Sequence, residues 1–173
     1  MHIFTTHRPY NSLLYPRHTL EPDCTDPFHR EPYIASFRAS NGNFDATFIT
    51  IHTDPDEATA EINGLDAVVN YAQGTYPDEQ DFIVMGDLNA DGSYFDEYGT
   101  SMIRGSEYYW VIGGGVDTTT KSTDYTYDRI IITDSAVRVL SGDLGVFWYD
   151  LEYGLSEDET VAISDHYPVY VDI

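Results

Sequence analysis

The segment between residues 46 and 89 constrains the fold of this chain more than any other. It begins with Ala46 to His52, a run dense in β-branched and aromatic residues that predicts a strand. A helix is expected next, because apolar residues recur at three- and four-residue spacing, and a short buried strand from Asp81 to Met85 follows it. A helix between two strands predicts an α/β protein with mixed sheets.

The expected helix has clear limits in the sequence. Asp54, Pro55 and Glu57 are interpreted as an N-cap, a first-turn proline and the acidic residue of a capping box. Gly74 and Pro77 are expected to end the helix. One apolar face is expected to pack on the sheet, and it carries Ala58, Ile62, Leu65, Val69 and Ala72.

Strands outnumber helices in the rest of the chain. They are predicted at Tyr33 to Phe37, Arg129 to Thr133, Ala136 to Leu140, Val146 to Trp148 and Tyr167 to Asp172. The length of 173 residues favours a single domain over residues 1–173, since it allows one core and is too short for two domains. No apolar run approaches the length of a membrane span, so no membrane partner is expected.

Side chains suited to phosphoester chemistry lie at the ends of these predicted strands. If adjacent strand ends converge, six of them point into one crevice. Carboxylate and amide oxygens are the ligands of hard divalent cations, and an imidazole moves protons near neutral pH. The pattern predicts a metal-assisted phosphodiesterase site. The six residues are His52, Asp87, Asn89, Asp128, Asp165 and His166.

Each of these groups alone also fits a structural role. The sequence Gly86 to Asn89 is compatible with an ordinary turn, Asp128 with a surface ion pair to Arg129, and His52 with a hydrogen-bonded core histidine. The dipeptide Asp165-His166 in front of a proline-rigidified strand is harder to explain structurally. The combination of all these motifs, in this order, favours the catalytic interpretation.

The charge balance restricts how nucleic acid is bound. Thirty acidic residues face eight basic ones, the net charge is −22, and Lys121 is the only lysine. Such a surface repels polyanions in dilute salt, whereas at roughly 1 M salt the Debye length falls to about 3 Å and screens the repulsion. We interpret the composition as adaptation to salt, with a very soluble acidic protein as the alternative. A bound metal and a few arginines must then hold any phosphate.

Several separate motifs resemble the deoxyribonuclease I family, within the endonuclease/exonuclease/phosphatase superfamily. The resemblance runs from near Met1 to Ile173. One motif departs from the family pattern, because Leu88 stands in place of the usual Phe. The motifs are Arg30-Glu31-Pro32, Ile51-His52-Thr53, Gly86-Asp87-Leu88-Asn89-Ala90, Asp117-Thr118-Thr119, Tyr127-Asp128-Arg129-Ile130 and Ser164-Asp165-His166-Tyr167-Pro168. The resemblance implies a two-sheet α/β sandwich of the deoxyribonuclease I type. It also implies metal-dependent endonucleolytic cleavage of DNA. Two alternatives stay open: another phosphodiesterase or phosphatase of the superfamily, and a catalytically dead fragment or binding module.

The resemblance further implies a role for each motif residue. The catalytic residues would be His52, Asp128 and His166. The ligands of Mg²⁺ or Mn²⁺ would be Asp87, Asn89 and Asp165. The substrate contacts would come from Arg30, Tyr127 and Asn89. A structural Ca²⁺ loop would comprise Asp117, Thr119 and Thr123, although Lys121 lies inside this loop and would repel a cation.

The resemblance also shows what this chain lacks. Family members have a further stretch ahead of the point where this chain begins, which supplies a metal-binding glutamate and a glutamate paired with the histidine equivalent to His52. His2 and His7 do not replace them, and Cys24 has no partner for an internal disulfide. We therefore expect a fold that lacks the family's first strands and helix, and reduced activity unless an upstream fragment completes it. Family members are often exported, which suggests an extracellular location, but no signal peptide is visible.

Overall fold

The structure is a computed structural model, and it describes residues 11–14, 27–39 and 44–173, with residues 11–14 described by their backbone alone. His2, His7 and Cys24, which were considered above, lie outside these ranges. Within the described ranges, no helix is both long enough and apolar enough to cross a membrane.

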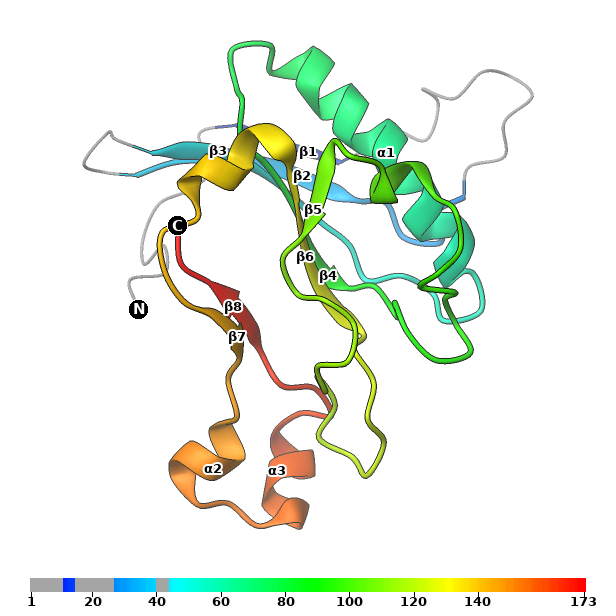
Figure 1. The fold of residues 1–173 in the computed structure, drawn as a ribbon, viewed down its shortest axis with the longest axis vertical. Coiled ribbons are helices and arrows are strands. Elements are labelled where there is room, and N and C mark those ends of the chain that lie inside the picture. Colours follow the sequence, from blue (N-terminus) through cyan, green and yellow to red (C-terminus); the bar gives the residue numbers. More distant parts are fainter. Residues whose placement is uncertain (1–10, 15–26, 40–43) are drawn as a thin grey trace.

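Six strands form the larger sheet, with bounds Asn11–Leu14 (β1), Tyr33–Arg38 (β2), Asp45–Thr50 (β3), Phe82–Asp87 (β4), Tyr108–Trp110 (β5) and Asp128–Thr133 (β6). Their order is β1-β2-β3-β4-β6-β5 (Figure 1). Only the pair β3 and β4 is parallel, as the crossover through a helix requires. The strands predicted in this part of the sequence are therefore confirmed to within two residues at each end.

The crossover helix α1 spans Ala58–Thr75 and covers one face of the larger sheet (Figure 1). Its buried face contains every residue of the predicted apolar stripe. The predicted capping box is wrong, because α1 begins after Glu57 and no side chain caps its first turn. The Asp54 carboxylate instead accepts the backbone N–H of Asp56, 3.0 Å away, and so holds a turn ahead of the helix.

The second sheet has two antiparallel strands, Leu144–Val146 (β7) and Val169–Val171 (β8). It lies on the side of the larger sheet opposite α1 (Figure 1). Alternation along β6 serves both layers: Ile131 packs in the α1 cluster, whereas Ile130 and Ile132 pack toward Val169 and Val171 of β8. The predicted α/β fold with two sheets is confirmed.

Three predictions in the C-terminal third need correction. Residues 136–140, predicted as a strand, lie largely in the 3₁₀ helix η2 (Asp134–Val139), because Val139 and Leu140 pack on the core from a helical turn without strand pairing. The strand predicted at residues 146–148 ends at Val146, and the one predicted at 167–172 is confined to β8.

Sequence patterns did not reveal five short elements. They are β1, β5, the 3₁₀ helix η1 (Met102–Arg104), α2 (Tyr149–Tyr153) and α3 (Glu157–Ile163). A capping box does occur, but in α3, where Ser156 and Glu159 bond reciprocally. Each element is too short for a periodic signal to stand out.

Candidate active site

Two carboxylates face each other where β4 ends and β6 begins. Asp87 is the last residue of β4 and Asp128 is the first of β6, and the antiparallel register makes them direct partners. Both side chains are largely buried. The pairing of β4 with β6 therefore brings together two residues that are far apart in the sequence.

The segment ahead of β8 adds His166 to this pair of carboxylates. The backbones of His166 and Thr119 form an isolated antiparallel β-bridge. The N–H of the next residue, Tyr167, donates to the carbonyl of Thr118 at 2.8 Å. The imidazole Nδ1 lies 2.7 Å from Asp128 Oδ2, and Nε2 lies 3.7 Å from Asp87 Oδ2. Asp128 thus fixes the ring and leaves Nε2 directed toward Asp87.

His52 lies on the other side of Asp87. Its Nε2 is 3.4 Å from Asp87 Oδ2, so this carboxylate stands between two imidazoles. The His52 side chain is 58% exposed, which excludes the core-histidine alternative. Arg30 donates to the carbonyl oxygen of His52 at 2.7 Å and thereby joins the predicted arginine to the same edge of the site.

Asn89 occupies a strained turn directly after β4. Its φ is 48°, and its backbone N–H donates to Asp87 Oδ1 at 3.1 Å. Its side-chain amide nitrogen donates to the carbonyl and hydroxyl of Thr53 at 3.1 and 3.3 Å. Because the amide nitrogen is held by Thr53, the amide oxygen is the group that remains for a ligand.

The Asp128–Arg129 surface pair considered above is not formed. Arg129 is fully buried, donates to the carbonyls of Ala90 and Ile112, and pairs with Glu97. Arg129 thus anchors the loop that follows Asn89, while Asp128 binds His166.

The surroundings shift the pKa values of two central groups upward. Burial raises the pKa of the Asp87 carboxyl, and the N–H of Asn89 and the nearby His166 only partly offset this effect. The hydrogen bond that the imidazole donates to the Asp128 carboxylate raises the pKa of His166 above its ordinary value, against the opposing effect of burial. The site therefore makes the His166 imidazole more basic than usual, and the Asp87 carboxyl group beside it also binds a proton more tightly than usual.

We expect Asp128→Asn to lower the pKa of His166 in the metal-free protein, because the charged hydrogen-bond acceptor is lost. Since the folded-state pKa of His166 is raised, its stabilising contribution is complete below the unfolded pKa of about 6.5 and is lost as pH rises through the folded value. NMR titration of the imidazole Cε1–H with a chelator present measures this shift. Asp143→Asn removes an exposed carboxylate elsewhere and should leave the titration unchanged; an equal shift in both variants contradicts the assignment.

The donor set fits a hard divalent cation. Ligand atoms of Asp87, Asp128 and His166 all lie within 4.8 Å of one another. Buried carboxyl oxygens whose desolvation is unfavourable are stabilised by a cation placed between them. The predicted ligand Asp165 lines the neighbouring pocket, but its Oδ2 pairs with Lys121 Nζ at 3.1 Å, which lowers the pKa of Asp165.

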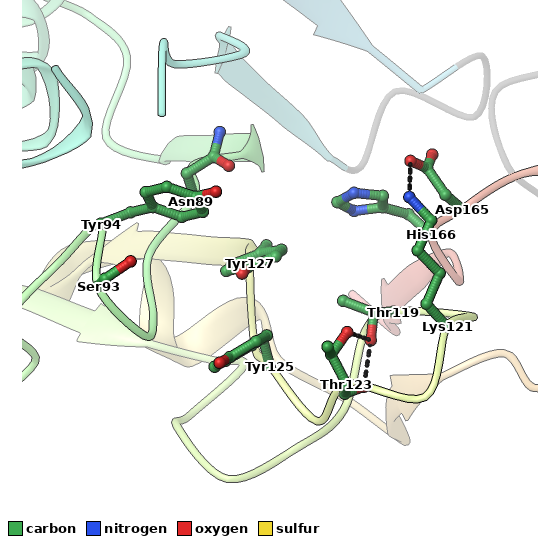
Figure 2. A pocket seen from close by; sticks show the side chains of 10 residues that line it. All are labelled: Asn89, Ser93, Tyr94, Thr119, Lys121, Thr123, Tyr125, Tyr127, Asp165 and His166. Carbon is green, nitrogen blue, oxygen red and sulfur yellow. Dashed lines mark hydrogen bonds and ion pairs between the residues drawn. The ribbon is translucent and has the colours of Figure 1, made fainter. Parts of the chain in front are cut away.

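A pocket of about 380 Å³ opens beside these groups (Figure 2). Its lining includes the predicted residues Asn89, Tyr127, Asp165 and His166. Arg30 is not among its lining residues, although it contacts His52. The structure therefore brings the six strand-end residues to one region, with the carboxylate–histidine cluster at its centre.

The predicted calcium loop lies against the same pocket. Asp117 Oδ1 and the carbonyl oxygen of Thr123 lie 2.8 and 2.6 Å from the hydroxyl of Thr119, so oxygen atoms of all three predicted residues converge. Lys121 belongs to this loop by sequence, but its ammonium group is directed to Asp165. A calcium ion at this loop stays a proposal.

Sequence reasoning missed two buried threonines that position the site. Thr53 holds the amide of Asn89, and Thr118 Oγ1 accepts the backbone N–H groups of Tyr127 and Asp128 at 3.0 and 3.2 Å. Both are fully buried. Their position inside the motifs was the one sequence signal for a role at the site, because threonine is common in any strand-rich sequence.

Comparison with solved structures shows which fold this chain shares with other proteins. The chain superposes on D. rerio TDP2 complexed with single strand DNA product, with a TM-score of 0.56, 17% identity and coverage of 93% of this chain and 66% of that one. A functionally unknown conserved protein from Enterococcus faecalis V583 gives a TM-score of 0.56 at 13% identity, with coverage of 95% and 66%. At these identities the superpositions show a shared α/β fold.

The sequence comparisons then give the family. The chain is 37% identical over 153 residues to deoxyribonuclease-1 of Bos taurus and 35% identical over 162 residues to deoxyribonuclease gamma of Mus musculus. These alignments cover 84% and 90% of this chain but 54% and 52% of the relatives. No protein-family model matches the chain. The chain is thus similar in sequence to deoxyribonuclease-1 and deoxyribonuclease gamma, and it spans about half the length of the curated relatives it matches.

Proposed function

We propose that this chain hydrolyses phosphodiester bonds of DNA with a bound divalent cation, Mg²⁺ or Mn²⁺. The observation that carries the proposal is the arrangement of Asp128, His166 and Asp87, in which one carboxylate fixes the imidazole and the other faces its second nitrogen. The names of the sequence relatives support DNA as the substrate.

Each group has a proposed role in this reaction. His166 accepts a proton from the attacking water at Nε2, and Asp128 stabilises the imidazolium that results. His52, on the far side of Asp87, protonates the leaving oxygen or binds the phosphate. Arg30 and Tyr127 contact the substrate. Asp87, Asn89 and Asp165 hold the cation, which when bound stabilises the charge that develops on the phosphate.

Metal-dependent nicking of supercoiled DNA tests this proposal. We expect relaxed circles to form with Mg²⁺ or Mn²⁺ and to disappear with a chelator. The assay should be run in dilute salt and at about 1 M KCl, because screening relieves the repulsion between DNA and a chain of charge −22. Absence of nicking in all conditions contradicts the proposal, whereas turnover of a phosphomonoester alone favours the phosphatase alternative.

Two finer proposals follow from the similarity to the deoxyribonucleases. The upstream fragment implied by the resemblance would supply carboxylates to the cation and to His52, so nicking by this chain is expected to be slower than nicking by bovine deoxyribonuclease-1 at equal concentration. An extracellular location is proposed from the family resemblance.

A further inference from the structure

Three tyrosine rings form one wall of the pocket described above. Tyr125 and Tyr127 are stacked, with ring centroids 5.2 Å apart and planes 16° apart, and Tyr94 tilts against Tyr127 at 5.7 Å. Figure 2 shows these rings on one side of the pocket, with His166 and Lys121 on the other. We call Tyr94, Tyr125 and Tyr127 the tyrosine wall.

The wall is fixed by the backbone around it. Tyr125 and Tyr127 are two residues apart in an extended segment, so both point the same way while Thr126 between them is buried. Thr118 bonds to the backbone of both tyrosines. The carbonyl of Tyr94 accepts the hydroxyl of Thr59 on α1 at 2.9 Å. The rings are therefore held in place before any ligand arrives.

We propose that the tyrosine wall is a stacking subsite for an unpaired nucleobase next to the scissile phosphate, so that this chain prefers single-stranded or locally melted DNA. This inference rests on the proposed function, since it names the form of DNA that the same site takes. The pocket volume of about 380 Å³ lies within the range of small-ligand sites.

The position of the wall places a base beside the chemistry. The Tyr127 ring centroid is 6.1 Å from the imidazole of His166, the group that faces Asp87. A base stacked in the pocket would thus hold its own phosphate near His166. Bases inside a duplex cannot reach this wall without being flipped out of the stack.

The charge of the chain favours stacking over electrostatic attraction. A duplex carries a phosphate for about every 1.7 Å of its axis, twice the density of one strand, and a net charge of −22 repels it accordingly. Stacking of a base on an aromatic ring contributes about 1–3 kcal/mol, and it is not an attraction between two exposed charges that salt would screen.

Binding of a short single strand that contains 2-aminopurine tests the subsite without turnover. With a chelator present and about 1 M KCl, we expect quenching of its fluorescence on stacking, and about tenfold tighter binding than for an abasic strand of equal length. The same strand annealed to its complement should bind more weakly than the free single strand.

Tyr94→Ala and Tyr125→Ala should remove the preference over the abasic strand, and Tyr94→Phe and Tyr125→Phe should retain it because the ring remains. Tyr98→Ala is the matched control, since Tyr98 is 95% exposed and is not a pocket residue. Equal binding of base-containing and abasic strands by the wild type, or full preference in both alanine variants, overturns the inference.

The two proposals fail in different ways. Nicking of DNA without any preference for unpaired bases would contradict the stacking subsite but support the proposed hydrolysis. The opposite result is base-dependent binding and quenching that require the tyrosines, without any cleavage. It would support the stacking subsite and contradict the proposed hydrolysis.

Discussion

Replacing His166 by alanine is expected to lower the rate of DNA nicking by this chain about 1,000-fold. The imidazole links the two carboxylates at the strand ends: Nδ1 bonds to Asp128 and Nε2 faces Asp87. Without it, the proposed acceptor for the proton of the attacking water is missing. The measurement is the initial rate of relaxed-circle formation at saturating Mg²⁺.

The control for this prediction is His29→Ala. The side chain of His29 is exposed, and its backbone N–H donates to the Glu61 carboxylate at 2.8 Å. We expect a nicking rate within a factor of two of the wild type, because general acid–base roles are local. A His166→Ala protein that keeps its circular dichroism spectrum and more than a tenth of the rate would contradict the role given to His166.

Replacing Gly86 by alanine is expected to destabilise the protein by at least about 3 kcal/mol, through clash and backbone strain together. Gly86 has φ 151°, which favours glycine, and a methyl group there would overlap the carbonyl oxygen of Ile51. That oxygen is backbone and cannot rotate away. The end of β4 would have to separate from the segment that carries His52, so the position of Asp87 should shift as well.

Chemical denaturation of Gly86→Ala beside Gly74→Ala measures the effect. Gly74 lies in α1, and a methyl group added there meets no heavy atom within 4 Å. This second variant should be more stable than the wild type by about 0.5 kcal/mol, since alanine is the better helix former. A Gly86→Ala protein as stable as the wild type would show that β4 does not approach residue 51 so closely.

Sequence and structure agree most closely over residues 45–87. The strand, helix and strand between residues 45 and 87 were predictable, because alternation and three- to four-residue spacing are local signals over long elements. The start of α1 was not predictable, because the Asp54 carboxylate accepts the backbone N–H of Asp56 and does not cap the helix. Residues 136–140 look like a strand by composition, and only their position after β6 makes them a 3₁₀ turn.

At the site, the motifs identified which residues converge but not how. His52, Asp87, Asp128 and His166 do meet, as the strand ends predicted. Two interactions could not be predicted from the sequence: the ion pair of Asp165 with Lys121 and the hydrogen bond from the Asn89 amide to Thr53. They join residues that are 44 and 36 positions apart.

The sequence by itself determined the α/β class, the helix between two strands and the identity of the polar groups at the strand ends, because periodicity and motif chemistry are properties of neighbouring residues. The tertiary structure alone decided that Asp87 faces Asp128 across β4 and β6, and that three tyrosines line the pocket beside them. The physical reason is that register and long-range packing arise from the free energy of the whole assembled sheet, which no local pattern specifies.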